Sequence, residues 1–343
     1  MTAGLKVLSP GLHTTVQDLG RVGYQALGVP VSGALDPVAL RLGNMLVGNP
    51  PGAAALEILL SGPSFEVAAE TARVAVAGPG ASLLIGGGAH VVPAWQSVTL
   101  SRGGAFQVNL GREAVCAYIA VEGGIAVRSV LGSASTYVRA ALGGFDGRAL
   151  QRGDFLRLAT DRVVERAEQR LPSPPAAGSE RAIRVILGPQ QDHFTDNALA
   201  ALLDAEFRVS QSADRMGMRL EGPLLRHRRG WDIVSDAIVT GAIQVPGSGQ
   251  PILLLADHQT TGGYPKIATV ISADLPVVGR RHPGDAIRFA AVSIDEAEQL
   301  ARDEERHLAA LVASFEAVTT GGGIDLASLY AGNLISGVVT ATE

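Results

Sequence analysis

The sequence is built from short apolar runs that end at glycine or proline within a few residues. The chain has 343 residues, of which 42 are glycine and 18 are proline, and these two residue types favour turns and interrupt helices. Many short strands with frequent turns are typical of β-barrels or sandwiches and not of alternating βαβ units. We therefore predict a mainly β protein. Eight runs have the length and composition of strands: residues 73–78, 82–87, 97–101, 117–121, 182–188, 242–246, 251–257 and 286–292.

A few helices are marked by their capping residues. Asp36 is a natural N-cap because Pro37 follows it, and proline is favoured in the first turn of a helix. Ser293 and Glu296 have the spacing of a capping box before an amphipathic stretch. We expect a third helix over residues 195–205.

The chain is long enough for two domains, each with its own core. The stretch RLPSPPAAGSE, at 170–180, has the composition of a linker. We expect a boundary near residue 175, which gives an N-terminal β-barrel half (1–175), a C-terminal β-barrel half (176–318) and a tail (319–343). Three similar turn-plus-strand pieces suggest a duplicated unit. They are RGGAFQV (102–108), RGDFLRL (152–158) and PGDAIRF (283–289).

Composition excludes several classes of function. The net charge is −5 with no basic block, so we expect no nucleic-acid partner. Cys116 is the single cysteine, which excludes internal disulfides and a cysteine-based metal site, and the histidines lack the spacing of metal ligands. No apolar run approaches the ~20 residues that span a bilayer. We expect a soluble, cytoplasmic protein with no metal ligands. The phosphate-loop, dinucleotide, zinc-protease and nucleophile-elbow motifs are absent from the sequence, so these motifs assign no reaction.

The stretch ADHQTTGGYPKIA, residues 256–268, contains a lysine in a chain that almost always uses arginine. Lys6 and Lys266 are the only lysines among 28 basic residues. A lysine ammonium is a compact charge whose pKa shifts on burial, whereas a guanidinium is planar and always charged. Lys266 therefore predicts a role that arginine cannot fill; the alternative is a surface lysine placed by chance.

The residues before Lys266 are further candidates for a site. The apolar run at 251–257 has the pattern of a buried strand, and the polar residues follow directly after it. The small residues of the TTGG segment would offer backbone N–H groups to an anion. The candidates in this stretch are Asp257, His258, Gln259, Thr260, Thr261, Gly262, Gly263 and Tyr264.

Three other polar segments allow two interpretations each. Residues 13–36 form either part of a site or a surface loop before a capped helix, and residues 188–195 either part of a site or a helix start. The segment ADRMGMRLEG, 213–222, supplies Arg215 either to a site or to an exposed ion pair.

Several segments together resemble the KipA family, which is also labelled allophanate hydrolase subunit 2, the C subunit of 5-oxoprolinase (PxpC) or biotin-dependent carboxyltransferase. The resemblance covers about residues 8 to 290 and implies cyclophilin-like β-barrel domains. The segments that carry it include TTVQDLGRVGYQALGVPVSGALD, GPQQDHFT, RMGMRLEG, GAIQVPGSGQPILLLAD and, most specifically, QTTGGYPKIA.

The resemblance also implies a heteromeric enzyme. The expected partner is a KipI-like protein, also called allophanate hydrolase subunit 1 or PxpB, with a LamB/YcsF-like third subunit. Such a complex opens 5-oxoproline to L-glutamate with ATP hydrolysis. No biotin-attachment motif occurs in the sequence, so any biotin would arrive on another chain. Two alternatives stay open: carboxyl transfer in a urea carboxylase-type system, and a non-catalytic regulator that binds a KipI-like kinase inhibitor.

Within this function the candidate residues take different roles. Lys266, the amides of Gly262 and Gly263, and Thr260 or Thr261 would stabilise negative charge that develops on a substrate oxygen. Asp257 or His258 would move protons, and Tyr264 would orient the substrate. Gln259 would bind the substrate, and Gln244 and Arg215 would contribute from neighbouring loops.

Overall fold

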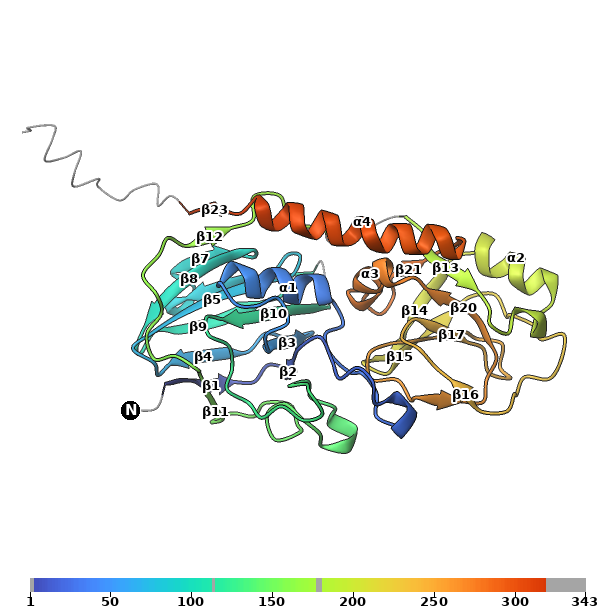
Figure 1. Ribbon diagram of the computed structural model, residues 1–343, viewed down its shortest axis with the longest axis horizontal. Helices are drawn as coiled ribbons and strands as arrows, with labels where there is room; N and C mark the ends of the chain where they lie inside the picture. Colours follow the sequence, from blue (N-terminus) through green and yellow to red (C-terminus); the bar gives the residue numbers. More distant parts are fainter. Residues whose placement is uncertain (1–2, 113–114, 177–180, 319–343) are drawn as a thin grey trace, which may run out of the picture.

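The computed structural model describes residues 3–112, 115–176 and 181–318. The described chain is mainly β with four α-helices (Figure 1), which confirms the prediction of a mainly β protein. The cyclophilin-like nature of its two halves stays a prediction. The predicted tail and the end of the predicted linker lie outside these residues. The boundary near residue 175 stays a prediction.

The first half of the chain forms two antiparallel sheets within the described residues. One has the order β11 (Phe155–Arg157), β1 (Gly4–Ser9), β4 (Ser64–Val67), β9 (Ala105–Asn109), β6 (Ser82–Ile85) and β7 (His90–Pro93). The other has the order β2 (His13–Gln17), β3 (Ala55–Leu59), β10 (Cys116–Val121), β5 (Thr71–Ala77), β8 (Gln96–Ser101), β12 (Gln169–Arg170) and β23 (Glu316–Ala317).

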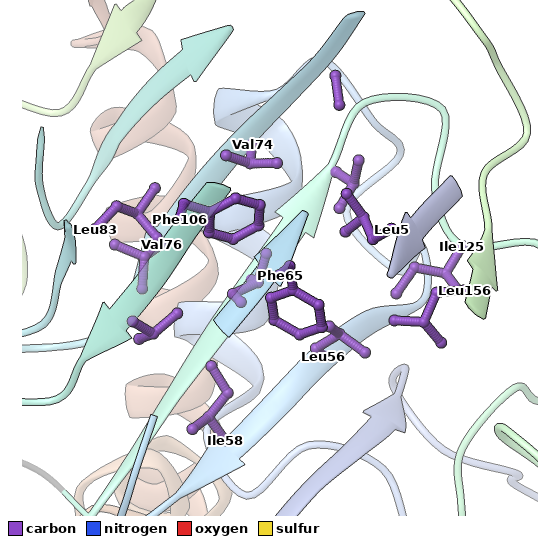
Figure 2. Close-up of a cluster of buried hydrophobic side chains, with 14 of the residues drawn as sticks. Leu5, Leu56, Ile58, Phe65, Val74, Val76, Leu83, Phe106, Ile125 and Leu156 are labelled. Carbon is purple, nitrogen blue, oxygen red and sulfur yellow. The ribbon is translucent and has the colours of Figure 1, made fainter. Parts of the chain in front are cut away.

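A hydrophobic core draws its side chains from strands of both sheets (Figure 2). The alternation of side chains along a strand turns every second residue inward; Leu5 and Val7 of β1 are both buried in this way. Phe65 and Phe106 are paired across β4 and β9 with ring centroids 5.4 Å apart. The first half therefore has its own core.

The second half forms an eight-stranded, nearly closed, barrel-like sheet. Its two edge strands, β21 and β22, are separated along the chain by Arg288 alone. The run at 286–292, predicted as one strand, is therefore two short strands on opposite edges. The sheet order is β21 (Ala286–Ile287), β14 (Phe207–Asp214), β15 (Gly217–Glu221), β18 (Ile252–Leu254), β17 (Ala242–Gln244), β20 (Lys266–Val270), β13 (Ile183–Leu187) and β22 (Phe289–Ala291).

The three predicted helices are present, with the caps that predicted them. The Asp36 carboxylate accepts a hydrogen bond from the Ala39 amide at 2.9 Å, and the Ser293–Glu296 capping box is formed. The sequence did not predict α3, which is only five residues long. The described helices are α1 (Pro37–Leu46), α2 (Asp196–Asp204), α3 (Leu275–Gly279) and α4 (Ile294–Ala313). The 3-10 segments are η1 (Gln25–Leu27), η2 (Gly86–Gly88), η3 (Val138–Ala140), η4 (Gln191–His193) and η5 (Ser272–Asp274).

Helix α4 spans the two halves and returns the chain to the first one (Figure 1). It contacts α1, and β23 after it pairs with β12 in the seven-stranded sheet. Glu305 of α4 forms an ion pair with Arg41 of α1 at 2.6 Å. The last described residues thus pack against the first half, although the sequence had assigned them to the second.

The described residues contain neither a membrane-spanning helix nor a cluster of metal-ligating side chains. No helix among them is long and apolar enough to cross a membrane. No group of three or more His, Cys, Asp or Glu side chains among them is arranged to hold a metal ion.

Candidate functional site

Lys266 is buried and ion-paired. It is the first residue of β20, its side chain is 3% exposed, and its Nζ lies 2.7 Å from Oδ2 of Asp236. Its hydrogen bond lowers the pKa of the Asp236 carboxyl, so this carboxylate is charged at neutral pH. Lys266 is therefore not a surface lysine placed by chance.

Gln190 holds both partners of this ion pair. Its Oε1 accepts from the backbone N–H of Lys266 at 3.1 Å, and its Nε2 donates to Oδ2 of Asp236 at 3.1 Å. The segment at 188–195 therefore reaches the candidate site. The pair is fixed by backbone and side-chain contacts together.

A small two-stranded sheet, which we call the flap, carries Asp236. Strand β16 (Asp236–Ala237) pairs with β19 (Thr261–Gly262), with Asp236 opposite Gly262. The backbone oxygens of Thr260 and Gly263 accept hydrogen bonds from the chain around β16. The TTGG segment is therefore half of the flap. The role of its amides as donors to an anion stays a prediction.

The flap packs closely against neighbouring side chains at Gly262. A Cβ built there would lie 2.7 Å from Cδ1 of Ile238 and 2.8 Å from Nε2 of Gln244. Gln244 is 2% exposed, and it faces Lys266 across the β17–β20 pair. The flap thus approaches the Gln244 amide closely.

Three of the candidate residues line one cavity of about 410 Å³. Gln259 donates from Nε2 to Oε1 of Gln244 at 3.3 Å, and Gln244 donates from Nε2 to the Tyr264 carbonyl at 3.3 Å. The Tyr264 ring lies 6.3 Å from the Trp231 ring, centroid to centroid. Other polar residues that line the cavity are Gln211, Ser212, Asp214 and Arg219. The cavity therefore offers amide groups, which can both donate and accept hydrogen bonds.

Asp257 and Arg215 are paired with each other away from solvent. Arg215 donates to both carboxylate oxygens of Asp257, at 2.9 and 3.1 Å, and also to Glu57 in β3 of the first half. It also donates to the Gly33 carbonyl at 2.6 Å. Burial acts to lower the pKa of Arg215, but the carboxylates of Glu57 and Asp257 raise it above its usual value. The polar segment at 13–36 and the residues before the TTGG segment therefore meet at one buried ion network.

His258 is fully buried and stands between Asp257 and Gln259 in the sequence. Its Nδ1 lies 2.6 Å from the carbonyl of Gln259, and its Nε2 has no hydrogen-bond partner among the described residues. Burial lowers the pKa of His258. Its imidazole is therefore neutral at pH 7.

Comparison with known proteins gives a family. The family described as "carboxyltransferase domain, subdomain A and B" matches this chain over residues 27–291. The chain belongs to this carboxyltransferase family.

The relatives of this chain include two bacterial proteins. The C subunit of 5-oxoprolinase from Haemophilus influenzae is 34% identical over 304 residues, which cover 89% of this chain and 96% of the relative. The protein of the same name from Escherichia coli is 34% identical over 308 residues, covering 88% and 96%.

One solved structure with a similar fold belongs to a much larger protein. The urea carboxylase of Kluyveromyces lactis is 30% identical with a TM-score of 0.81. The match covers 93% of this chain but only 30% of that one, so this carboxyltransferase-family chain spans less than a third of the larger protein.

Sequence reasoning missed two residues at the centre of the site. Gln190 stands in the polar segment at 188–195, and the resemblance of GPQQDHFT to the family was a signal for it. Asp236 stands in a stretch without a motif, and it meets Lys266 through a contact between residues 30 positions apart. No local pattern indicates that contact.

Proposed function

We propose that this chain belongs to a heteromeric, ATP-dependent 5-oxoprolinase, as its C subunit, and that the complex opens the cyclic amide 5-oxoproline to L-glutamate. The observation that carries the proposal is the buried Lys266–Asp236 pair next to Gln244, whose side-chain amide lines the cavity together with that of Gln259. The two relatives with the 5-oxoprolinase name, each matched over 96% of its length, support this choice of substrate.

The geometry suits a substrate that contains an amide. A lactam presents one C=O and one N–H, and the side-chain amides of Gln244 and Gln259 complement both. Negative charge develops on the carbonyl oxygen when the C–N bond of the ring is opened, and preorganised donors stabilise it. In our proposal Lys266 supplies the positive charge, with the backbone amides of Gly262 and Gly263 and the hydroxyls of Thr260 or Thr261 as further donors.

The remaining candidates take positioning and proton-transfer roles in this proposal. His258 is neutral at pH 7 and has an unpartnered Nε2 among the described residues; in our proposal this nitrogen accepts the proton. The bidentate pairing of Asp257 with Arg215 favours a positioning role for both residues over proton transfer by Asp257. Tyr264, together with Trp231, would form the wall that orients the ring.

The cavity by itself lacks the positive charges that are needed to bind ATP. A triphosphate carries several negative charges and is normally held by a set of cations, whereas Arg219 is the one basic residue among the described residues that line the cavity, and Asp214 is acidic. We therefore place ATP on surfaces shared with the partner subunits, a KipI-like (PxpB-like) protein and a LamB/YcsF-like third subunit. We also keep the cyclophilin-like nature of the two halves and the cytoplasmic location as proposals.

Reconstitution tests the proposed function. The purified chain should show no ATP hydrolysis that depends on 5-oxoproline, and it should co-elute with its KipI-like partner from a sizing column. Addition of the third subunit should then produce both ADP and L-glutamate. Turnover by the isolated chain would refute the need for partners. Co-elution without turnover by the full complex would favour the regulatory alternative.

Carboxyl transfer to urea is the second candidate. The name of the matched family, carboxyltransferase domain, and the structural similarity to a urea carboxylase favour it. It predicts that the complex consumes ATP with urea only when a biotinylated carrier is present on another chain. The same assay with urea in place of 5-oxoproline distinguishes the two.

A further inference from the structure

Four strands of the barrel-like sheet align a row of side chains that crosses the candidate site. Arg219 of β15 is opposite Ile252 of β18, Ile252 is opposite Gln244 of β17, and Gln244 is opposite Lys266 of β20. Residues directly opposite each other in neighbouring strands share one face of a sheet. Arg219 and Lys266 therefore lie on the same face, with Gln244 between them.

The spacing of this row matches a small molecule. Neighbouring strands are about 4.8 Å apart, so three steps place the backbones of Arg219 and Lys266 roughly 14 Å apart. A metabolite with a single small ring is shorter than this distance, so one fits along the row. Arg219, Ile252 and Gln244 all line the 410 Å³ cavity.

Arg219 is the uncompensated charge of this cavity. Its side chain makes no hydrogen bond or ion pair with any residue that the structure describes. The other charged residue of the lining, Asp214, is already engaged. Its carboxylate accepts from the amides of Met216 at 2.7 Å and Gly217 at 3.2 Å, and it lies 3.6 Å from Arg139 of the first half. The cavity thus has one free cation and no free anion among its described residues.

We propose that Arg219 binds the carboxylate of the substrate and makes this site specific for an anionic amide over a neutral one. The proposal rests on the proposed function for the location of the site. A guanidinium binds a carboxylate through two parallel hydrogen bonds, and 5-oxoproline carries one carboxylate on its lactam ring. With that carboxylate at Arg219, the ring extends along the row toward Gln244 and Lys266. Urea has no carboxylate and gains nothing from Arg219.

Equilibrium binding to the full-length chain in complex with its partner subunits tests this. The probes are 5-oxoproline, 2-pyrrolidinone, which is the same ring without the carboxylate, and urea. We expect Arg219→Gln to weaken 5-oxoproline binding roughly 10- to 100-fold, as for the loss of a charge-assisted pair, and to leave 2-pyrrolidinone binding unchanged. In turnover, KM for 5-oxoproline should rise by the same factor while kcat changes little.

The matched control is Arg208→Gln. Arg208 lies on β14 of the same sheet, is not part of the cavity lining and pairs with Glu206 at 3.0 Å. It should leave all three affinities unchanged. Equal affinity of the Arg219→Gln variant and the unaltered chain for 5-oxoproline would overturn the proposal, as would equal binding of 5-oxoproline and 2-pyrrolidinone.

The outcome separates this inference from the proposed function. Binding of 5-oxoproline that depends on Arg219, without its hydrolysis, would support the carboxylate site and refute the proposed reaction. Hydrolysis of 5-oxoproline with an unchanged KM in Arg219→Gln would support the reaction and overturn the carboxylate site. Failure of the complex to bind 5-oxoproline would overturn both.

Discussion

At the scale of the residue, the position of the Lys266 ammonium is set by its contact with Asp236 and by Gln190, which contacts both residues. Asp236 Oδ2 lies 2.7 Å from Nζ, while Gln190 holds both the Lys266 backbone and the Asp236 carboxylate. The hydrogen bond from Lys266 lowers the pKa of Asp236. The pair is therefore formed at neutral pH and is lost only when the pH falls through that lowered pKa. Lys266 keeps its ionic partner throughout the physiological range.

Lys266→Arg should lower kcat of the reconstituted complex by roughly 100-fold, the usual loss when one preorganised donor is misplaced. The guanidinium is larger and planar, and the position is 3% exposed, so the new cation cannot occupy the place of the ammonium. Steady-state kinetics measure the loss, and thermal unfolding should change little. The control is Lys6→Arg at the other lysine, which is exposed in β1. Full activity of Lys266→Arg would remove lysine-specific chemistry from the mechanism.

The sequence predicts those site residues whose signal lies within a few neighbouring positions, and it misses those that depend on contacts between distant positions. Lys266 was found because one lysine among arginines is visible in the sequence itself, and Gln244, Gln259 and Tyr264 do line one cavity. Asp236 was not found because its contact with Lys266 depends on the flap. Arg215 was predicted to contribute to a site, but its bond to Glu57 spans 158 positions, and no pattern indicates such a contact. Their catalytic and binding roles stay predictions.

At the scale of the element, the flap connects the TTGG segment to the cavity. It is made of two-residue strands, which are too short for side-chain alternation to predict. The capped helices were predictable because a cap is a contact within three or four residues. The flap depends instead on Gly262, where the backbone approaches Gln244 and Ile238 closely.

Gly262→Ala should reduce turnover of the complex at least 10-fold while it lowers the free energy of unfolding by less than about 1 kcal/mol. The atoms that the new methyl group would meet, Ile238 Cδ1 and Gln244 Nε2, are the ends of flexible side chains, so the fold adjusts and the amide of Gln244 moves. Kinetics and denaturant unfolding measure the two effects. Gly52→Ala is the control, because it lies outside the site and its nearest atom is also the end of a flexible side chain, Leu19 Cδ1 at 3.2 Å. Equal activity of the two variants would show that the flap does not position Gln244.

At the scale of the whole molecule, the contacts that join the two halves include an exposed ion pair and a buried ion network. Helix α4 crosses between them at the surface (Figure 1). Its Glu305 forms an exposed ion pair with Arg41 of α1. In the interior, Glu57 of the first half pairs with Arg215 of the second and also accepts a hydrogen bond from the Tyr118 hydroxyl at 2.6 Å. The composition predicted two β-rich halves, but not these contacts, because each of them joins residues far apart in the sequence.

Glu57→Gln tests whether the interior contact holds the halves together. It should lower the free energy of unfolding by about 3 kcal/mol, because removal of one partner leaves a buried charge less compensated. Arg215 keeps Asp257 as its second carboxylate, which limits the loss. Glu305→Gln removes the exposed pair and should cost less than about 1 kcal/mol, since Glu305 is 63% exposed. Denaturant unfolding of both variants measures the difference.

The same two variants should also differ in turnover. Arg215 holds Asp257, which immediately precedes His258 and Gln259, so the complex with Glu57→Gln should lose turnover, whereas the complex with Glu305→Gln should not. Equal stability of the two variants would mean that the buried Glu57–Arg215 contact does not hold the second half against the first.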